Sequence, residues 1–146
     1  MRQAAWLNTA PRRASKRGGT DEPISRRKKL QADGIEPDEP PIDAGAHLIE
    51  YLFEVGPDAP GAMGPVPITH ADIAHWQGNT GIILNAWEAR TLRRLSREYV
   101  GACIDAQEPD ALPPYLPAEA VARRRAAVAR NVAAALSGRG SARKES

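Results

Sequence analysis

Apolar side chains recur at helical spacing in three runs along the middle of the chain. The first run, 44–55, follows Asp43 as a candidate N-cap and ends at Gly56-Pro57. The second begins at Thr69, which forms a capping box with Asp72, and is short because Gly78 to Gly81 carries helix-stopping residues. The third begins at Asn85, with Glu88 three positions on, and ends near Gln107 before a proline. These runs predict three helices between residues 42 and 108.

The third helix has an apolar face and a basic face. Its apolar stripe recurs at spacings of three and four, with Leu92 and Cys103 beside it: Trp87, Thr91, Leu95, Tyr99, Ala102 and Ala106. Four arginines fall mainly on the remaining surface: Arg90, Arg93, Arg94 and Arg97. Tryptophan supplies bulk that the chain otherwise lacks, so we expect a structural centre of Trp76, Trp87, Leu92, Leu95 and Tyr99. The alternative is that one indole is partly exposed and anchors a protein partner.

The remaining segments carry weaker patterns. Residues 1–41 show no sustained period, and a lone Trp6 brings no partner surface, so we expect a disordered arm that is basic and then acidic. Residues 57–67 contain four prolines, which predict a loop without a hydrogen-bonded ladder. A proline-rich joint over 109–117 precedes an Ala/Arg-rich helix predicted at 118–137. Residues 138–146 are expected to form a disordered tail.

The fourth helix has a narrow apolar stripe, interrupted by Arg125, and is therefore expected to be peripheral: Val121, Val128, Val132 and Leu136. The fold class predicted is all-α, a small bundle of three principal helices with this fourth helix and disordered ends. Leu, Ile, Val and Phe together supply only 26 of the 146 residues, so the core is small and a partner is expected to complete it.

Charge is divided into three blocks along the chain. Residues 1–30 carry nine Lys or Arg against two acids, residues 31–75 carry nine acids and no Lys or Arg, and residues 76–146 carry eleven basic residues against seven acids. The single cysteine, Cys103, fits a reducing compartment. No apolar run is long enough to cross a bilayer. We therefore expect a cytoplasmic protein without a membrane partner.

No group of residues has the spacing of a catalytic or metal site. His70 and His75 lie five residues apart, which places them on different helix faces. Cys103 lies on or beside the apolar stripe, and Ser96 has no base nearby in the sequence. The glycines near residue 60 alternate with prolines and do not form a phosphate-binding loop. We expect no catalytic, cofactor-binding or metal-binding residues and no enzymatic activity.

Binding to nucleic acid is the alternative function. The second helix, a turn and the Arg-rich third helix superficially resemble a helix-turn-helix. The connection from Gly78 to Leu84 is longer than the usual turn, and the arginines lack base-reading Asn or Gln neighbours. The basic run from Arg26 to Lys29 is suited to nonspecific contacts with the phosphates of nucleic acid. A small DNA-binding packaging or regulatory protein is therefore retained as the second hypothesis.

A series of helix caps and apolar positions runs through the segment from Leu52 to Tyr99: Ile68-Thr69, Ile73-Ala74, Trp76-Gln77, Thr80-Gly81, Leu84, Trp87-Glu88 and Leu95-Ser96. In this pattern, which ends at Tyr99, roughly a third to two fifths of the chain resembles the small tail assembly chaperones of long-tailed bacterial viruses and their prophages. The resemblance implies a non-enzymatic helical protein in the host bacterial cytoplasm. Such a protein holds the tape-measure protein and helps to recruit tail-tube protein subunits.

Six side chains are candidates for binding such a partner: Trp76, Trp87, Arg90, Arg93, Arg94 and Arg97. The Ala/Arg-rich fourth helix is a second candidate surface, because a chaperone needs adaptable amphipathic helices and charged surfaces. Assembly into a homo-oligomer stays open at this point.

Overall fold

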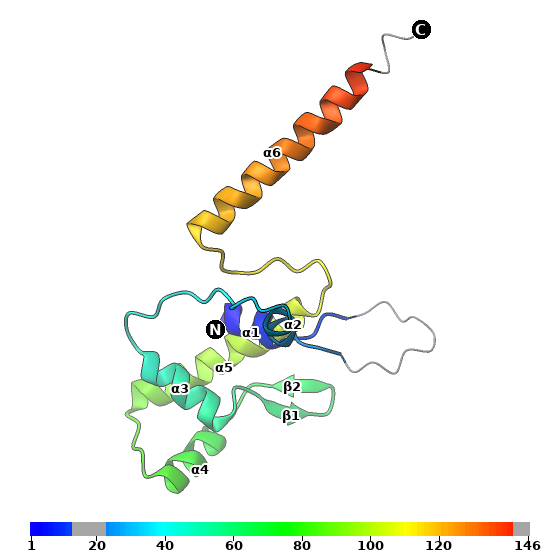
Figure 1. Ribbon diagram of the computed structural model, residues 1–146. Helices are drawn as coiled ribbons and strands as arrows, with labels where there is room; N and C mark the ends of the chain where they lie inside the picture. Colours follow the sequence, from blue (N-terminus) through cyan, green and yellow to red (C-terminus); the bar gives the residue numbers. More distant parts are fainter. Residues whose placement is uncertain (13–22, 142–146) are drawn as a thin grey trace. The chain divides into compact units, whose positions relative to one another are not determined.

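The chain is mainly helical, with one small two-stranded sheet (Figure 1). The computed structural model describes residues 1–12 and 23–141. It divides into two units, Met1–Pro114 and Tyr115–Ser146. The elements of the first unit are α1 (Arg2–Asn8), α2 (Arg26–Ala32), α3 (Ala46–Val55), β1 (Ala59–Gly61), β2 (Gly64–Val66), α4 (His70–Thr80) and α5 (Ala86–Ala106). The second unit holds α6 (Ala118–Ser141).

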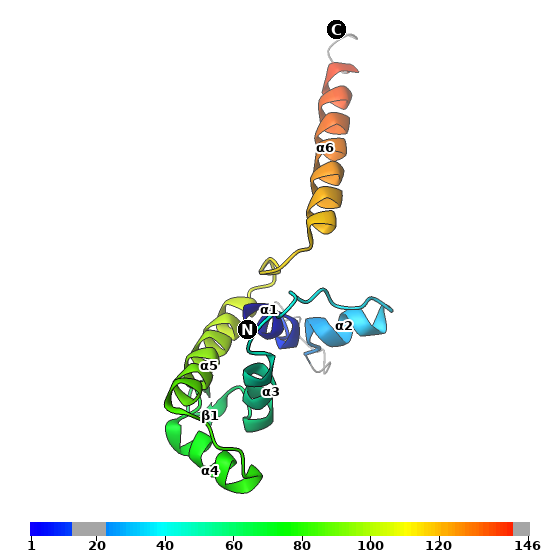
Figure 2. The same ribbon diagram turned by 90° about the vertical axis from the view of Figure 1, so that its left-hand side faces the viewer.

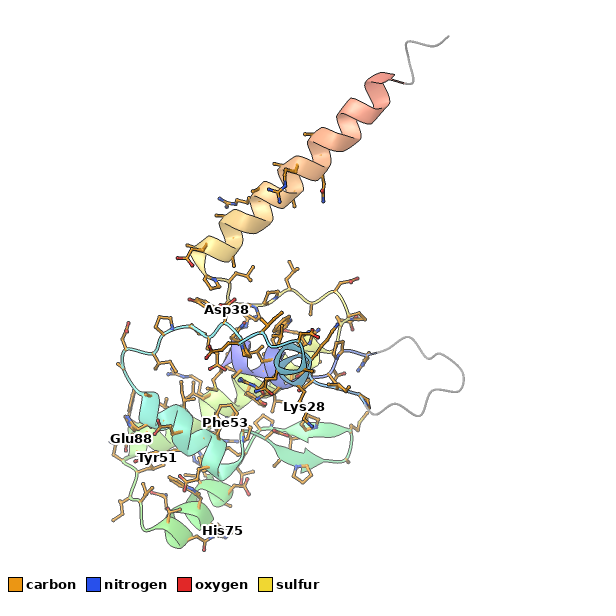
Figure 3. All side chains as sticks on the ribbon, in the orientation of Figure 1. Lys28, Asp38, Tyr51, Phe53, His75 and Glu88 are labelled. Carbon is orange, nitrogen blue, oxygen red and sulfur yellow. The ribbon has the colours of Figure 1, made fainter. Side chains whose placement is uncertain are left out.

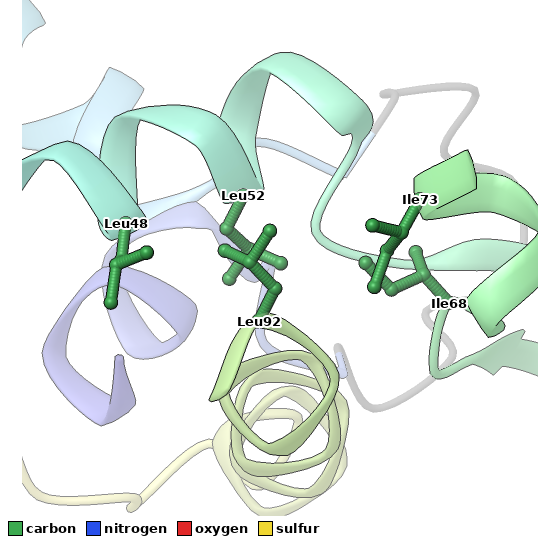
Figure 4. Close-up of a cluster of buried hydrophobic side chains, with 5 residues drawn as sticks. All are labelled: Leu48, Leu52, Ile68, Ile73 and Leu92. Atoms are coloured by element: carbon green, nitrogen blue, oxygen red, sulfur yellow. The ribbon is translucent and has the colours of Figure 1, made fainter. Parts of the chain in front are cut away.

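The main core lies where α3 and α4 pack against α5 (Figure 2). Five aliphatic side chains are almost fully buried there and meet in one cluster (Figure 4): Leu48, Leu52, Ile68, Ile73 and Leu92. Partly buried Tyr51, Val55 and Leu95 pack around that cluster. Each fully buried aliphatic side chain contributes about 1.5–3 kcal/mol relative to an exposed one, so this cluster is the main apolar contribution to folding of the first unit.

The caps predicted for α4 and α5 are confirmed. Thr69 and Asp72 form a reciprocal capping box at the start of α4, and Asn85 and Glu88 form another at the start of α5. The predicted end of α5 near Gln107 is also confirmed, since Gln107 is its C-cap. However, α4 continues through Gly78 and ends only at Gly81, whose φ of 74° is the left-handed conformation that terminates helices.

The start of α3 differs from the prediction. Asp43 is not the N-cap; the helix begins after Gly45, which has a φ of 76° and offers no side-chain cap. The chain turns sharply at this glycine, so the first turn of α3 begins at Ala46, three residues after Asp43. The predicted end at Gly56 is confirmed.

The proline-rich segment forms a β-hairpin, so the expected loop without a ladder is wrong. Strands β1 and β2 pair antiparallel, with Pro60 opposite Pro65 and Gly61 opposite Gly64. Neither proline has an N–H, so this pair occupies the position where antiparallel partners do not exchange hydrogen bonds. A Cβ on Gly61 would lie 2.5 Å from Cγ1 of Val66, which explains the glycine at the turn.

The expectation of a disordered arm over residues 1–41 is wrong for α1 and α2. Helix α1 packs on α5, and its Ala5 and Leu7 are buried. The Trp6 indole donates a hydrogen bond from Nε1 to the carbonyl oxygen of Ala111 at 2.8 Å. A seven-residue helix is too short to show a 3.6-residue period, and its partners lie about a hundred positions away in sequence. Residues 13–22 of the expected arm lie outside the described residues.

One arginine joins the N-terminal segment to the end of α5. The Arg26 guanidinium donates to the carbonyl oxygens of Ala106 at 2.6 Å and Glu108 at 3.0 Å. It also donates to the carbonyl oxygens of Trp6 and Thr9, each at 3.4 Å, and lies 4.7 Å from the centroid of the Trp6 ring. Arg26 therefore stabilises the carboxyl end of α5 with a positive charge and holds α1 beside it.

The second unit consists of a short lead and α6. The helix begins at Ala118 as predicted, but it runs to Ser141, so the expected disordered tail is wrong for residues 138–141. Residues 142–146 of that tail lie outside the described residues. No helix in the described part of the chain is both long and apolar enough to span a membrane.

Candidate partner-binding surface

The exposed side of α5 carries a continuous row of large side chains. The buried side chains of this helix include Leu92, Ser96 and Tyr99. Trp87, Arg90, Arg94 and Arg97 are all exposed, at spacings of three, four and three. Such spacing keeps residues on one face of a helix. We refer to these four residues as the α5 stripe.

An exposed tryptophan begins the α5 stripe. The Trp87 side chain is 59% exposed, so its predicted place in the structural centre is wrong. Ile83, four positions earlier in the chain, is 91% exposed. Ile83 and Trp87 therefore both present apolar surface at the start of α5. The arrangement matches the alternative that one indole lies at the surface.

The arginines of the α5 stripe have no partner within the described residues. No ion pair or hydrogen bond joins Arg90, Arg94 or Arg97 to another described side chain. Like charges at i, i+3 and i, i+4 repel, each pair costing about 0.2–0.5 kcal/mol. The row therefore holds positive charge that is available to an anionic partner.

Arg93 and Trp76 differ from the α5 stripe, although both were predicted site residues. Arg93 is half-buried, and its Nε atom is buried without a hydrogen-bond partner among the described residues. Trp76 is only 7% exposed, and its ring centroid lies 5.2 Å from that of Tyr51. The structure therefore brings Trp87, Arg90, Arg94 and Arg97 together and places Trp76 in the interior.

The start of α5 is fixed by contacts from α3 and α4. Gln77 of α4 accepts a hydrogen bond at Oε1 from the backbone N–H of Leu84 at 2.6 Å. Glu88 caps the first turn and lies 3.7 Å from Nε2 of His47 on α3. Figure 3 labels Glu88 and Tyr51 near this end of the core. These contacts hold the turn that bears Trp87 in a fixed position.

Ser96 is a structural residue that sequence reasoning did not find. Its side chain is fully buried and bonds to the backbone of two other segments. A serine among arginines at positions 93, 94 and 97 gives no apolar signal, although it lies four positions after Leu92 on the buried side. Only that helical spacing could have indicated its burial.

The titratable groups near the core favour their neutral forms. Burial raises the pKa of the Cys103 thiol, which therefore stays protonated at neutral pH and is a poor nucleophile. Burial also raises the pKa of Tyr99, whose hydroxyl accepts a hydrogen bond from Nδ2 of Asn8 at 3.2 Å. No cluster of three His, Cys, Asp or Glu side chains suited to a metal ion is found over residues 1–12 and 23–141.

The connection between α4 and α5 is shorter than the sequence indicated. Because α4 continues to Thr80, only residues 81–85 separate it from α5. A helix-turn-helix joins its two helices with three or four residues. The geometry is therefore closer to that motif than expected, and it leaves the nucleic-acid alternative in place.

Comparison with known proteins found no matching family model, no matching curated protein and no matching solved structure.

Proposed function

We propose that this chain is a non-enzymatic protein-binding factor that acts as a tail assembly chaperone. In this proposal it works in the host bacterial cytoplasm, where it holds the tape-measure protein and recruits tail-tube protein subunits. The observation that carries the proposal is the exposed Trp87 side chain at the head of a row of arginines that have no ion-pair partner among the described residues. Tryptophan and arginine are the residues most enriched among those that dominate protein–protein binding energy.

The short length of the arginine row in the α5 stripe favours a protein partner over duplex DNA. From Arg90 to Arg97 the row advances about 10 Å along the helix axis, at 1.5 Å per residue. Exposed acidic side chains lie on the same helix just beyond the row, Glu98 and Asp105. Carboxylates beside a short basic row repel phosphate and weaken nonspecific DNA binding. A protein segment needs only a single carboxylate among the arginines and an apolar side chain on Trp87, so it meets less of this repulsion than a row of phosphates does.

The proposal is tested with tape-measure fragments from the same virus or prophage, retained on the immobilised full chain. Trp87→Ala should weaken retention by about tenfold or more, as expected for an interface anchor. The control is Met63→Ala, which removes another fully exposed apolar side chain, 103% exposed at the hairpin turn. Equal retention by both variants, or no retention by the unmodified chain, would overturn the proposal.

DNA binding is the second candidate, favoured by the free arginines and the short turn before α5. Gel shifts with duplex DNA at low and physiological salt test it, because phosphate contacts weaken steeply as salt rises. A salt-sensitive shift that is lost in Arg90→Glu/Arg94→Glu, together with no client retention, would replace the chaperone assignment with this one.

A further inference from the structure

Helix α6 carries an apolar groove that nothing in its own unit fills. Within the second unit, the groove is lined by Leu116 from the lead segment and by Val121, Val128 and Val132 from the helix. Val128 and Val132 are 59% and 53% exposed. The small side chains of Ala129 and Ala133 complete the lining, so another helix can approach the backbone closely.

The groove has the spacing of a coiled-coil seam. Val121, Arg125, Val128 and Val132 follow one another at intervals of four, three and four. Alternating intervals of three and four are those of the inward-facing positions of a heptad. Arg125 occupies one of these positions and is the only charged side chain among the described residues that line the groove. Its guanidinium would be buried in a helix pair, so the occupant must supply a carboxylate opposite it.

The charge of this part of the sequence indicates the chemistry of the occupant. Residues 118–146 carry seven Lys or Arg and two Glu. A second copy of α6 would set two such basic helices side by side and place Arg125 in a seam with no acid to pair with it. Arg125 in the seam requires a carboxylate, and a helix of net positive sequence attracts a partner of opposite charge. The complementary occupant is therefore acidic.

A helix fits this groove better than an anionic membrane does. Basic helices that lie on membranes insert Trp, Phe or Leu from their apolar face. The described part of α6 offers valine and alanine on that face, with Arg125 in its middle. Inserting the face into lipid would bury an unpaired guanidinium, whereas a partner helix can pair it with a carboxylate.

We infer that α6 is a docking site for one α-helix of a partner protein, a helix that carries an apolar stripe flanked by acidic residues and one acid within the stripe. The basis is the heptad spacing of an apolar groove around Arg125. This site shares no residue with the α5 stripe, so it stands independently of the proposed function and either can fail alone.

Two synthetic peptides serve as probes for the full-length chain. Each is a three-heptad amphipathic helix with leucine at the seam and glutamate at the central seam position; one has glutamate and the other lysine at the flanking positions. Fluorescence anisotropy should show the acidic peptide binding at least about tenfold more tightly than the basic one, with the difference reduced by salt. Equal affinity for the two peptides, or no binding of either, would overturn the inference.

Variants on α6 locate the binding. Val128→Glu places a carboxylate in the seam and should weaken binding of the acidic peptide by about tenfold or more. Ala126→Glu adds the same carboxylate at an exposed position outside the groove, on the side of the helix away from the seam, and should keep most of the affinity. Equal losses in the two variants would show that net charge alone controls binding and would overturn the inference.

Charge reversal in the seam gives the sharpest readout. A third peptide, identical to the acidic one except for lysine at the central seam position, should bind the unmodified chain less tightly than the acidic peptide, and Arg125→Glu should reverse that order. Far-UV circular dichroism checks that each variant keeps its helix content. Vesicles of anionic lipid and duplex DNA serve as competitors, and displacement of the acidic peptide by vesicles at low lipid concentration would assign the groove to membranes instead.

Discussion

The buried hydroxyl of Ser96 accepts a hydrogen bond from the backbone N–H of Ile68 at 2.9 Å, and it donates one to the carbonyl oxygen of Pro57 at 2.7 Å. One side chain of α5 therefore joins the two ends of the segment that contains the hairpin. Both backbone groups would otherwise lack a partner at the edge of the main core. These two hydrogen bonds tie the hairpin segment to α5 at both of its ends.

Ser96→Ala tests the contribution of these two hydrogen bonds. The variant leaves the N–H of Ile68 buried and unpaired, which should cost about 1–3 kcal/mol of the free energy of unfolding. Urea denaturation followed by circular dichroism measures the loss. Ser96→Cys keeps a weak donor and similar volume and should lose less than alanine does. A change below about 0.5 kcal/mol in Ser96→Ala would show that the two bonds contribute little.

Trp76 and Trp87 should respond in opposite ways to truncation. Trp76→Ala removes a buried ring from the contact with Tyr51 and should destabilise the first unit by about 3–5 kcal/mol. Trp87→Ala removes an exposed ring and should change stability by only about 0.5 kcal/mol. Thermal denaturation compares the two variants. A strongly destabilised Trp87→Ala would contradict the exposed placement of that ring.

Arg26 should matter far more than its neighbour Arg27. Arg26→Ala removes donors from four carbonyl oxygens and the contact with Trp6, and should cost about 1.5–3 kcal/mol. Arg27→Ala removes an exposed ion pair with Glu39 and a hydrogen bond to Asn8, and should cost about 0–1 kcal/mol. Hydrogen exchange should then show earlier opening of the α1 amides in Arg26→Ala alone. Equal exchange in the two variants would contradict the clamping role.

Asp72 makes the stability of the fold depend on pH. Hydrogen bonds from the backbone N–H and hydroxyl of Thr69 hold the pKa of this carboxyl below its ordinary value. The unfolded chain then binds the proton more readily, so the cap stabilises the fold above the ordinary Asp pKa and loses its effect as the pH falls through the lowered one. Denaturation midpoints between about pH 6 and about pH 3 should fall less in Asp72→Asn than in the unmodified chain. Thr69→Ala should likewise weaken the dependence of stability on pH. If the denaturation midpoint falls with pH as steeply in both variants as in the unmodified chain, the stabilising role of the Asp72 carboxylate is contradicted.

Local chemistry made the middle of the chain predictable. The capping boxes at Thr69 and Asn85 involve residues three positions apart, so their geometry is readable from sequence. The N-terminal helices depend on contacts between distant residues, such as Arg26 with Ala106 and Trp6 with Ala111. No local pattern encodes such pairs. The prolines of the hairpin predict no ladder, because proline lacks the N–H that a ladder ordinarily uses, whereas the register places both of them where no donor is needed.

The candidate surface was predictable in part. The arginine row follows from helical spacing alone, and three of the four predicted arginines are exposed together on α5. The two tryptophans could not be assigned from sequence, because each lies at a position compatible with the core. Their environments are decided by what packs against α4 and α5: Tyr51 covers Trp76, and Trp87 stays 59% exposed.

The pairing of Pro60 with Pro65 has a consequence beyond the turn itself. At a position without mutual hydrogen bonds, the backbone groups of both residues point away from the partner strand, toward the two outer edges of the ribbon. Proline has a carbonyl but no N–H to present at these edges. The middle residue of each strand therefore lacks the backbone N–H that an added strand would need as a hydrogen-bond donor. The ribbon thus resists growth into a larger sheet and is protected from edge-to-edge aggregation.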